Sequence, residues 1–277
     1  MTGIGDWSVI TEAFSRTAEH YDLFAEDHPH LARMRRKVYD HFLPYLPPGG
    51  QVLELASGTG TDAIYLAGQG LQVHATDIAP GMLARLEAKV ARLGLSDRVT
   101  TQRCSFTNLD GIQGGPYDAV FSNLGGLNCL SDLRPVIRSL PRLLRPGGVV
   151  TWVLMPRVCL WELAMLLTGQ VRFALRRLPT HGTMAQLEGL HFKVYYFTPK
   201  QVVDAFGDDY RLLAVEGLSV ITPPAESKNL AKRHPRLYRA LCRLDDRLSR
   251  RSPWWGWGDF FILSVRYEPR GMRGEQQ

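Results

Sequence analysis

The stretch VLELASGTGTDA, from Val52 to Ala63, is an apolar run that ends in small residues and leads into a helical pattern. Glycines at positions 58 and 60 let the backbone pass close to a ligand, because no Cβ stands in the way. A helix that begins near Thr61 would also offer free amide groups to that ligand. The stretch therefore predicts a strand, a binding loop and a helix in succession.

Strand and helix patterns alternate from this loop onward. The predicted strands are Gln51–Ala56, Gln72–Thr76, Val99–Arg103, Tyr117–Ser122 and Val149–Met155, and the helices between them are Thr61–Gln69, Gly81–Leu93 and Leu133–Leu144. Such alternation is typical of an α/β fold with a doubly wound, mostly parallel sheet. Two late strands, at Tyr210–Ile221 and 259–267, follow a predicted helix at Pro199–Phe206, and this order suggests an antiparallel addition to the edge of the sheet.

The 277 residues are enough for one large domain with an inserted segment. We predict a helical N-terminal cap (1–45), a binding core (46–155), an inserted cap (156–200), C-terminal strands with a basic helix (201–267) and a tail (268–277). The cap at 1–45 would hold helices at Ser8–His20 and Pro29–Tyr45. In the insertion we expect one or two apolar helices, a loop-like stretch at 180–189 and a strand at 191–198.

Charge and cysteine content restrict the class of protein. The net charge is +6, and the excess lies in residues 157–270, which hold 18 basic and 11 acidic residues. Four scattered cysteines without metal-ligand spacing fit reduced thiols, so we expect neither a metal nor a disulfide. The first residues lack the basic start and apolar stretch of a signal peptide. We therefore expect a cytoplasmic protein; the oligomeric state is not predicted.

A basic amphipathic helix is predicted over residues 228–251. It places Leu237, Leu241, Leu244 and Leu248 on one face and most of its arginines elsewhere. One interpretation is a lid helix whose leucines pack on the core. The alternative is peripheral contact with an anionic membrane, which the apolar helix at Leu160–Leu178 and three nearby tryptophans would support.

Acidic residues beside the loop discriminate between two classes of ligand. The run from Gly58 to Ala63 fits the G-x-G-x-x-G/A pattern of nicotinamide dinucleotide sites. Glu54, at the end of the first strand, would repel a pyrophosphate and favour an amine or a sulfonium. Asp77, at the end of the next strand, can accept both hydroxyls of a ribose. A nicotinamide oxidoreductase is therefore the less favoured alternative.

Three sequence segments in the same order resemble the class I S-adenosylmethionine-dependent methyltransferases of the small-molecule type. They are E-x-A-x-G-x-G at Glu54–Gly60, HATDIAPGML at 74–83 and YDAVFSNLGGLNCL at 117–130. The resemblance covers about residues 50–155 and implies a Rossmann-like enzyme that transfers a methyl group from S-adenosyl-L-methionine. It gives no family-wide motif for 1–45 or 157–200, where an acceptor would bind.

The resemblance also implies which residues contact the cofactor. The backbone at Ala56, Ser57 and Gly58 would face the methionine part, and Asp77 would hold the ribose. The remaining implied contacts are Ile78, Met82, Ser105 and Phe106 around the adenine, Asn123 and Leu124 below the sulfonium, Tyr21 as an aromatic cover, and Glu54 and Gly60 in the loop. Ala56 replaces the family's first glycine, and we expect it to be tolerated with a negative φ. Ser105 replaces an acidic residue.

The acceptor is only partly predictable. The fourth strand ends in SNLGG rather than the Asn-Pro-Pro-aromatic run of enzymes that methylate adenine amines, so we expect no nucleic-acid substrate. A small, fairly apolar acceptor of secondary metabolism is the preferred prediction, and a lipid or isoprenoid at a membrane surface is the alternative. His181 and His191 are weak candidates for a catalytic base. Since no acid or base is required by the pattern, a non-catalytic cofactor-binding protein also stays open.

Overall fold

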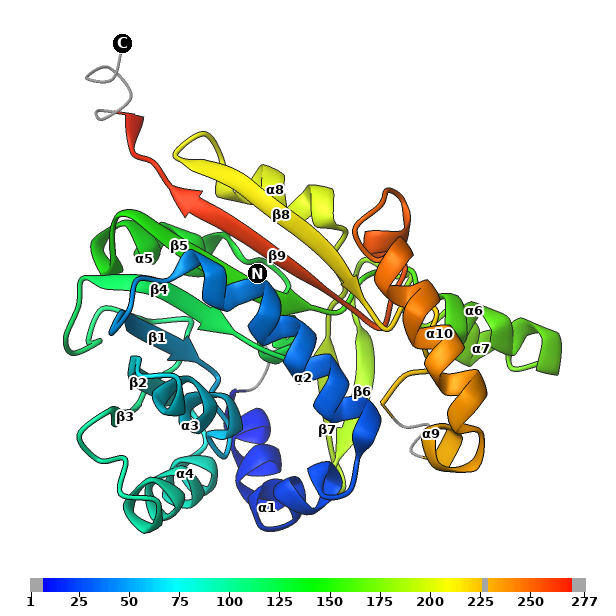
Figure 1. The fold of residues 1–277 in the computed structure, drawn as a ribbon, viewed down its shortest axis with the longest axis horizontal. Helices are drawn as coiled ribbons and strands as arrows, with labels where there is room; N and C mark the ends of the chain where they lie inside the picture. The colour runs from blue at the N-terminus through cyan, green and yellow to red at the C-terminus, as the bar shows by residue number, and fades with distance from the viewer. Residues whose placement is uncertain (1–6, 226–228, 271–277) are drawn as a thin grey trace.

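A computed structural model describes residues 7–225 and 229–270. A seven-stranded sheet forms its centre, with strand order β3-β2-β1-β4-β5-β9-β8 (Figure 1). The strands are β1 (Gln51–Leu55), β2 (Gln72–Asp77), β3 (Val99–Arg103), β4 (Tyr117–Ser122), β5 (Leu144–Leu154), β8 (Tyr210–Leu218) and β9 (Phe260–Tyr267). Strands β1 to β5 pair in parallel, and β9 runs antiparallel to both β5 and β8. The predicted α/β class and the antiparallel last strand are confirmed.

Helices cover both faces of the sheet. On one face, α2 (Pro29–Phe42), α3 (Thr61–Gly68) and α4 (Pro80–Arg92) bury apolar side chains against the strands. On the other, α5 (Arg134–Leu143) and α8 (Pro199–Phe206) pack around Trp152, the largest fully buried side chain. The helix α1 (Trp7–Ala25) packs on α4, at the carboxyl ends of the parallel strands (Figure 1). A short 3-10 turn, η1 (Leu43–Tyr45), follows α2.

The segment after β5 differs most from its prediction. It forms α6 (Leu160–Ala164), η3 (Met165–Thr168), α7 (Val171–Ala174) and a two-stranded hairpin of β6 (Thr183–Leu187) and β7 (Leu190–Val194). The loop predicted at 180–189 is therefore wrong. Its residues become a strand because β7 supplies antiparallel partners, which no local pattern reveals.

The predicted basic helix is divided in two. α9 (Asn229–Arg233) and α10 (Pro235–Leu248) meet at His234, directly before a proline that fits the first turn of a new helix. Residue 228 of the predicted helix and residues 271–277 of the predicted tail lie outside the described residues. The remaining 3-10 turns are η2 (Gly126–Cys129) and η4 (Trp254–Gly256). Within the described chain, none of the helices combines the length and apolar character needed to cross a bilayer.

Candidate functional site

A pocket of about 120 Å³ lies where β1, β2 and β4 end and α1 crosses above them. It brings together residues that are far apart in the sequence. Its lining includes the predicted residues Tyr21, Ala56, Gly58, Asp77, Ile78, Met82, Phe106, Asn123 and Leu124. Parallel strands bring their carboxyl ends to one edge, which is why these loops meet. Glu54, Ser57, Gly60 and Ser105 stand outside the lining, and the Ser105 hydroxyl is paired with that of Thr107.

The loop after β1 adopts a strained backbone. Ala56 has φ +55°, so the predicted negative φ is wrong. Gly58 and Gly60 also have positive φ, but for different reasons. A Cβ on Gly60 would overlap the Leu86 side chain, whereas a Cβ on Gly58 would meet nothing within 4 Å. Gly60 therefore permits α4 to pack closely, and Gly58 leaves open space on the pocket side of the loop.

Asp77 lies at the end of β2 with its carboxylate in the pocket lining. One oxygen accepts from the Gly58 amide at 2.9 Å and the other from the Ala79 amide at 2.8 Å. Burial raises the pKa of Asp77, and these backbone hydrogen bonds oppose that rise. Each carboxylate oxygen can accept more than one hydrogen bond. The side chain can therefore brace the loop and still accept from a ligand hydroxyl.

Glu54 lies next to last in β1, as expected, but its side chain is buried and outside the pocket lining. Its contact with a cofactor stays a prediction. Burial and the nearby Asp62 raise the pKa of Glu54 well above its usual range. The side chain is buried because β1 is an inner strand of the sheet, where a helix covers alternate side chains. Glu54 Oε2 and Ser57 Oγ have no hydrogen-bond partner within residues 7–225 and 229–270.

Asp62 organises the floor of the pocket, although no role was predicted for it. Its Oδ1 accepts from Arg35 Nη1 at 2.5 Å, from the Tyr39 hydroxyl at 2.5 Å and from Asn123 Nδ2 at 3.0 Å. Asn123 Oδ1 in turn accepts from the Leu124 amide at 2.8 Å. An acidic residue in the first turn of α3 was the available signal. The network fixes the direction of the Asn123 side chain.

Helix α1 closes the pocket from above and is tied to the loop. The Asp22 carboxylate accepts from the Thr59 hydroxyl at 2.6 Å and from Lys89 Nζ at 2.9 Å. Gly81 lets α1 approach α4, since a Cβ there would lie 2.7 Å from the Ser15 carbonyl oxygen. Burial raises the pKa of the Tyr21 hydroxyl, which lines the pocket one residue before Asp22. Tyr21 thus belongs to the pocket wall, and its role as a cover over the cofactor stays a prediction.

Additional lining residues come from α1 and from two loops. They are Trp7, Ile10, Phe14, Gly125, Gly126 and Cys129. The apolar residues of α1 recur at helical spacing, which was a usable sequence signal for one inward face. Trp7 contacts Phe106 edge to face, with ring centroids 5.4 Å apart. This side of the pocket is therefore apolar and aromatic.

The β6–β7 hairpin packs beside α1. Phe192 lies 5.8 Å from Phe14 between ring centroids, and the Tyr195 amide donates to the Asn128 carbonyl at 2.7 Å. His191 alternates with Phe192 along β7 and is exposed, and His181 is exposed in the turn before β6. Neither histidine lines the pocket. The two weak candidates for a base therefore lie away from the place where a ligand would bind.

Cys159, Glu162 and Asp259 form a buried group whose ligand atoms lie within 4.8 Å of one another. Such spacing would suit a metal ion. However, Arg177 donates to Glu162 Oε1 at 2.8 Å and to Asp259 Oδ1 at 2.8 Å. Burial disfavours the charged form of Arg177, yet the two carboxylates and Cys159 raise the pKa of the guanidinium. A cation from the chain itself therefore already balances these carboxylates.

Comparison with known proteins agrees with this geometry. Residues 52–148 match the model of a family described as a methyltransferase domain. The chain is 31% identical over 153 residues to a malonyl-[acyl-carrier protein] O-methyltransferase of Halorhodospira halophila, covering 52% of this chain and 47% of that protein. It is 28% identical over 148 residues to a demethylmenaquinone methyltransferase of Corynebacterium efficiens, covering 51% and 57%. The chain thus spans about half the length of these curated relatives.

Solved structures share the fold. The structure of the [4+2]-cyclase SpnF superposes with a TM-score of 0.54 at 17% identity, covering 86% of this chain and 80% of that one. The match to the methyltransferase domain runs from β1 into β5 and includes the ends of β1, β2 and β4, which form the pocket. The nicotinamide alternative gains no support from these matches. The chain therefore has the class I methyltransferase fold, and its residues 52–148 match a methyltransferase domain of the S-adenosyl-L-methionine-dependent type.

Proposed function

We propose that this protein transfers a methyl group from S-adenosyl-L-methionine to a small, fairly apolar acceptor held beneath α1. One observation carries the proposal: a single pocket joins the Asp77 carboxylate and the open backbone at Gly58 to an aromatic wall. The polar side suits the cofactor's ribose and amino acid. The apolar side, which includes Trp7, Phe14 and Phe106, suits an acceptor with little charge.

The residues fit this cofactor. Asp77 would accept from the ribose hydroxyls, and Ile78 and Met82 would pack against the adenine. The unpartnered Glu54 Oε2 and Ser57 Oγ, buried near the loop, are the polar atoms that a bound ligand or its water would satisfy. When bound, S-adenosylmethionine supplies a methyl carbon activated by its sulfonium. The chain's task is then to orient the acceptor and exclude water.

The pocket restricts how the acceptor can lose a proton. Its titratable lining residues are Tyr21, Asp77 and Cys129. Burial raises the pKa of Tyr21, and burial raises the pKa of the Cys129 thiol to about 12, so both stay protonated at neutral pH. Asp77 is engaged by two backbone amides. We therefore propose an acceptor that presents an unprotonated lone pair or loses its proton to water.

The size of the pocket implies movement. Ligand pockets usually enclose about 300–1,000 Å³, and this one encloses about 120 Å³. Helix α1 is the element whose displacement would enlarge it, because α1 forms one wall of the pocket, and Asp22 ties α1 to Thr59 of the loop and to Lys89 of α4. We propose that α1 moves outward to admit the cofactor and acceptor and returns to exclude water.

Calorimetric titration with S-adenosylhomocysteine, in parallel with NAD and NADH, tests the cofactor assignment. We expect micromolar binding of the thioether and none of the nucleotides. Asp77→Ala should weaken binding about tenfold or more, because a hydrogen-bonded charged partner is lost. Asp110→Ala is the matched control, since its carboxylate is exposed and is not part of the pocket lining. Equal affinity in Asp77→Ala and the control would refute the assignment of Asp77.

Acceptor identity requires a screen of apolar phenols, amines and carboxylic acids, followed by formation of S-adenosylhomocysteine. Because SpnF is a cyclase, each reaction should also be analysed for rearranged acceptor without methyl transfer. Turnover of acceptor with no S-adenosylhomocysteine formed would contradict methyl transfer while keeping the cofactor site. We further propose a cytoplasmic location, based on the four free cysteines.

A further inference from the structure

One end of the molecule exposes an unusual amount of apolar surface. It is built from residues 160–178, which contain α6, η3 and α7, and residues 229–251, which contain α9 and α10; we call it the basic end. Among the residues that the structure describes, thirteen large apolar side chains are exposed, and eight of them lie here: Leu166, Leu167, Val171, Phe173, Leu175, Leu178, Leu237 and Leu244. Leu167, in the turn η3, is 92% exposed. Concentrated exposure of this kind marks an interaction surface.

The two segments adjoin. The Trp161 indole of α6 donates to the Ile221 carbonyl at 3.1 Å, and the Ile221 amide donates to Asp245 of α10 at 2.9 Å. Both segments lie at the same end of the molecule, beyond the end of β8 and the start of β9 (Figure 1). Their exposed apolar side chains therefore belong to one end of the fold rather than to separate sites.

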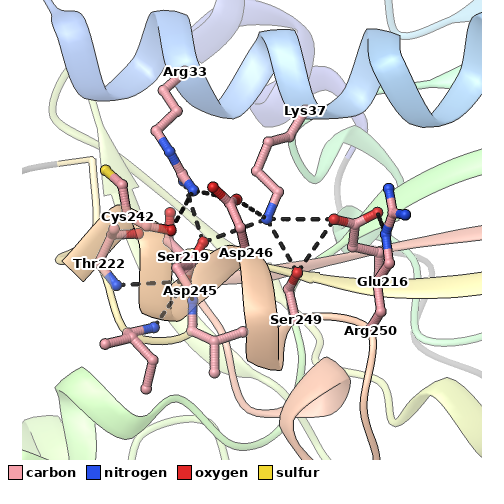
Figure 2. Close-up of polar contacts among 12 residues, drawn as sticks. Arg33, Lys37, Glu216, Ser219, Thr222, Cys242, Asp245, Asp246, Ser249 and Arg250 are labelled. Carbon is pink, nitrogen blue, oxygen red and sulfur yellow. Dashed lines mark hydrogen bonds and ion pairs between the residues drawn. The ribbon is translucent and has the colours of Figure 1, made fainter. Parts of the chain in front are cut away.

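Helix α10 exposes leucines because it is docked through polar side chains (Figure 2). Asp245 is fully buried and accepts from the Val220 amide at 2.7 Å and from the Ile221 amide at 2.9 Å. Arg33 and Lys37 of α2 reach the same carboxylate at 3.2 and 3.4 Å. A buried carboxylate needs these partners, so they determine which side of α10 faces inward.

The leucines are turned aside as a result. Leu241 and Leu248 are half-buried, whereas Leu237 and Leu244 are exposed. The interpretation of α10 as a lid whose leucine face packs on the core is therefore wrong. Arg236, Arg243 and Arg247 lie on the side of the helix next to the leucines, and all three are exposed. An apolar edge borders a basic face along the whole of α10.

The outward charge of the basic end is positive. Residues 229–251 hold eight lysines and arginines but only two acidic residues. Asp245 is buried, and the exposed Asp246 is paired with Arg33 and Lys37. In α6, Glu162 is buried against Arg176 and Arg177. Two copies of this surface would repel each other, whereas an anionic partner is complementary to it.

We propose that the basic end docks the protein on anionic lipid bilayers. Leu167 and the apolar edge of α10 enter the interface, while the neighbouring arginines contact the phosphate headgroups. An apolar turn beside a basic helix is more complementary to a lipid surface than to the surface of a folded acidic protein. The apolar side chains match the acyl-chain region of the bilayer, and the basic helix matches its phosphate headgroups. Docking is peripheral and independent of catalysis. It would nevertheless bring the pocket close to acceptors dissolved in the membrane.

Co-sedimentation of the full chain with vesicles tests the proposal. We expect binding to phosphatidylcholine vesicles containing phosphatidylglycerol, weaker binding in high salt, and little binding to phosphatidylcholine alone. The triple change Arg236→Glu, Arg243→Glu and Arg247→Glu should lower binding about tenfold or more. A control with the same net charge reverses three exposed arginines elsewhere, Arg85→Glu, Arg92→Glu and Arg138→Glu, and should retain most of it.

The exposed turn at Leu167 provides a second test, in which the net charge of the protein does not change. Leu167→Ser should lower vesicle binding about threefold or more without altering net charge, because an exposed apolar side chain is lost from the interface. Affinity for S-adenosylhomocysteine serves as the control of folding in every variant and is measured without vesicles. Absence of sedimentation at low salt would overturn the proposal, as would equal loss in the two charge-reversed triples. Either failure leaves the proposed methyl transfer untouched.

Discussion

Strands β1 to β5 and the segments that form the basic end are stabilised in different ways. In the strands, apolar residues such as Leu53 and Phe121 are completely buried, and neighbouring strands pair along their backbones. At the basic end, buried ion pairs centred on Arg177 and Asp245 attach the helices, and leucines stay exposed. Breaking a buried ion pair costs about 3–5 kcal/mol, more than the roughly 1.5–3 kcal/mol gained by burying one leucine. Charge therefore overrides hydrophobic periodicity there.

Removal of Arg177 should produce the largest effect. Arg177→Met leaves Glu162 and Asp259 buried with less compensation, so the free energy of unfolding should fall by about 3–5 kcal/mol. Urea denaturation provides the measurement. Arg176→Met is the matched control, because Arg176 is 35% exposed and, within the described part of the chain, forms an ion pair with Glu162 alone; it should cost about 1 kcal/mol or less. Equal losses in the two variants would mean that burial of the charges is not what holds α6.

A comparison of Gly60 and Gly58 separates close packing of the core from a role in ligand binding. Gly60→Ala combines a strained backbone with overlap against Leu86, so we expect a loss of about 2–4 kcal/mol. Gly58→Ala suffers the strain alone, about 1–2 kcal/mol, and should instead reduce affinity for S-adenosylhomocysteine. Thermal unfolding and calorimetry separate the two effects. If Gly58→Ala were the less stable variant, the assignment of the two roles would be reversed.

Acid should weaken the attachment of α10. Burial alone would raise the pKa of Glu216, but the hydrogen bond from His41 and the charges of Lys37 and Arg250 lower it to about 2. A carboxyl with a depressed pKa stabilises the fold above its unfolded pKa of 4.5 and loses that contribution as pH falls toward 2.

The matched variant for this pH effect is Glu216→Gln. Between pH 4.5 and 2 the wild type should lose up to about 1.4 kcal/mol per pH unit more than the variant. Urea denaturation at a series of pH values measures the difference, which should shrink toward pH 2. Parallel curves for the two proteins would contradict a role for the Glu216 charge.

The exposed leucines should give the smallest effect. Leu237→Gln and Leu244→Gln each remove an exposed side chain, so stability should change by no more than about 0.5 kcal/mol. Leu140→Ala, in the buried face of α5, should cost about 2–5 kcal/mol and calibrates the assay. A loss above about 2 kcal/mol at Leu237 would restore the interpretation of α10 as a helix packed by its leucines.

The same contrast explains which features were predictable. β3, β4 and α8 match their predicted bounds because turn residues and local periodicity delimit them. The loops that line the pocket were predictable because parallel strands place their ends together. The burial of Glu54 was not predictable, because it depends on how the helices packed on the sheet cover that side chain. Likewise β6 requires its partner β7, and the orientation of α10 requires Arg33 and Lys37, about 210 residues away.

Ala56 and Gly126 share one small space at the floor of the pocket. A Cβ on Gly126 would lie 2.7 Å from the Ala56 Cβ, and its other neighbours are at 3.8 Å or more. Only one of the two positions can therefore carry a methyl group. Ala56→Gly removes the obstacle and the backbone strain together, so the double variant with Gly126→Ala should be more stable than Gly126→Ala alone. Evolutionary substitutions at the two positions would then be coupled: a relative of this protein could gain a side chain at position 126 only after losing the one at position 56.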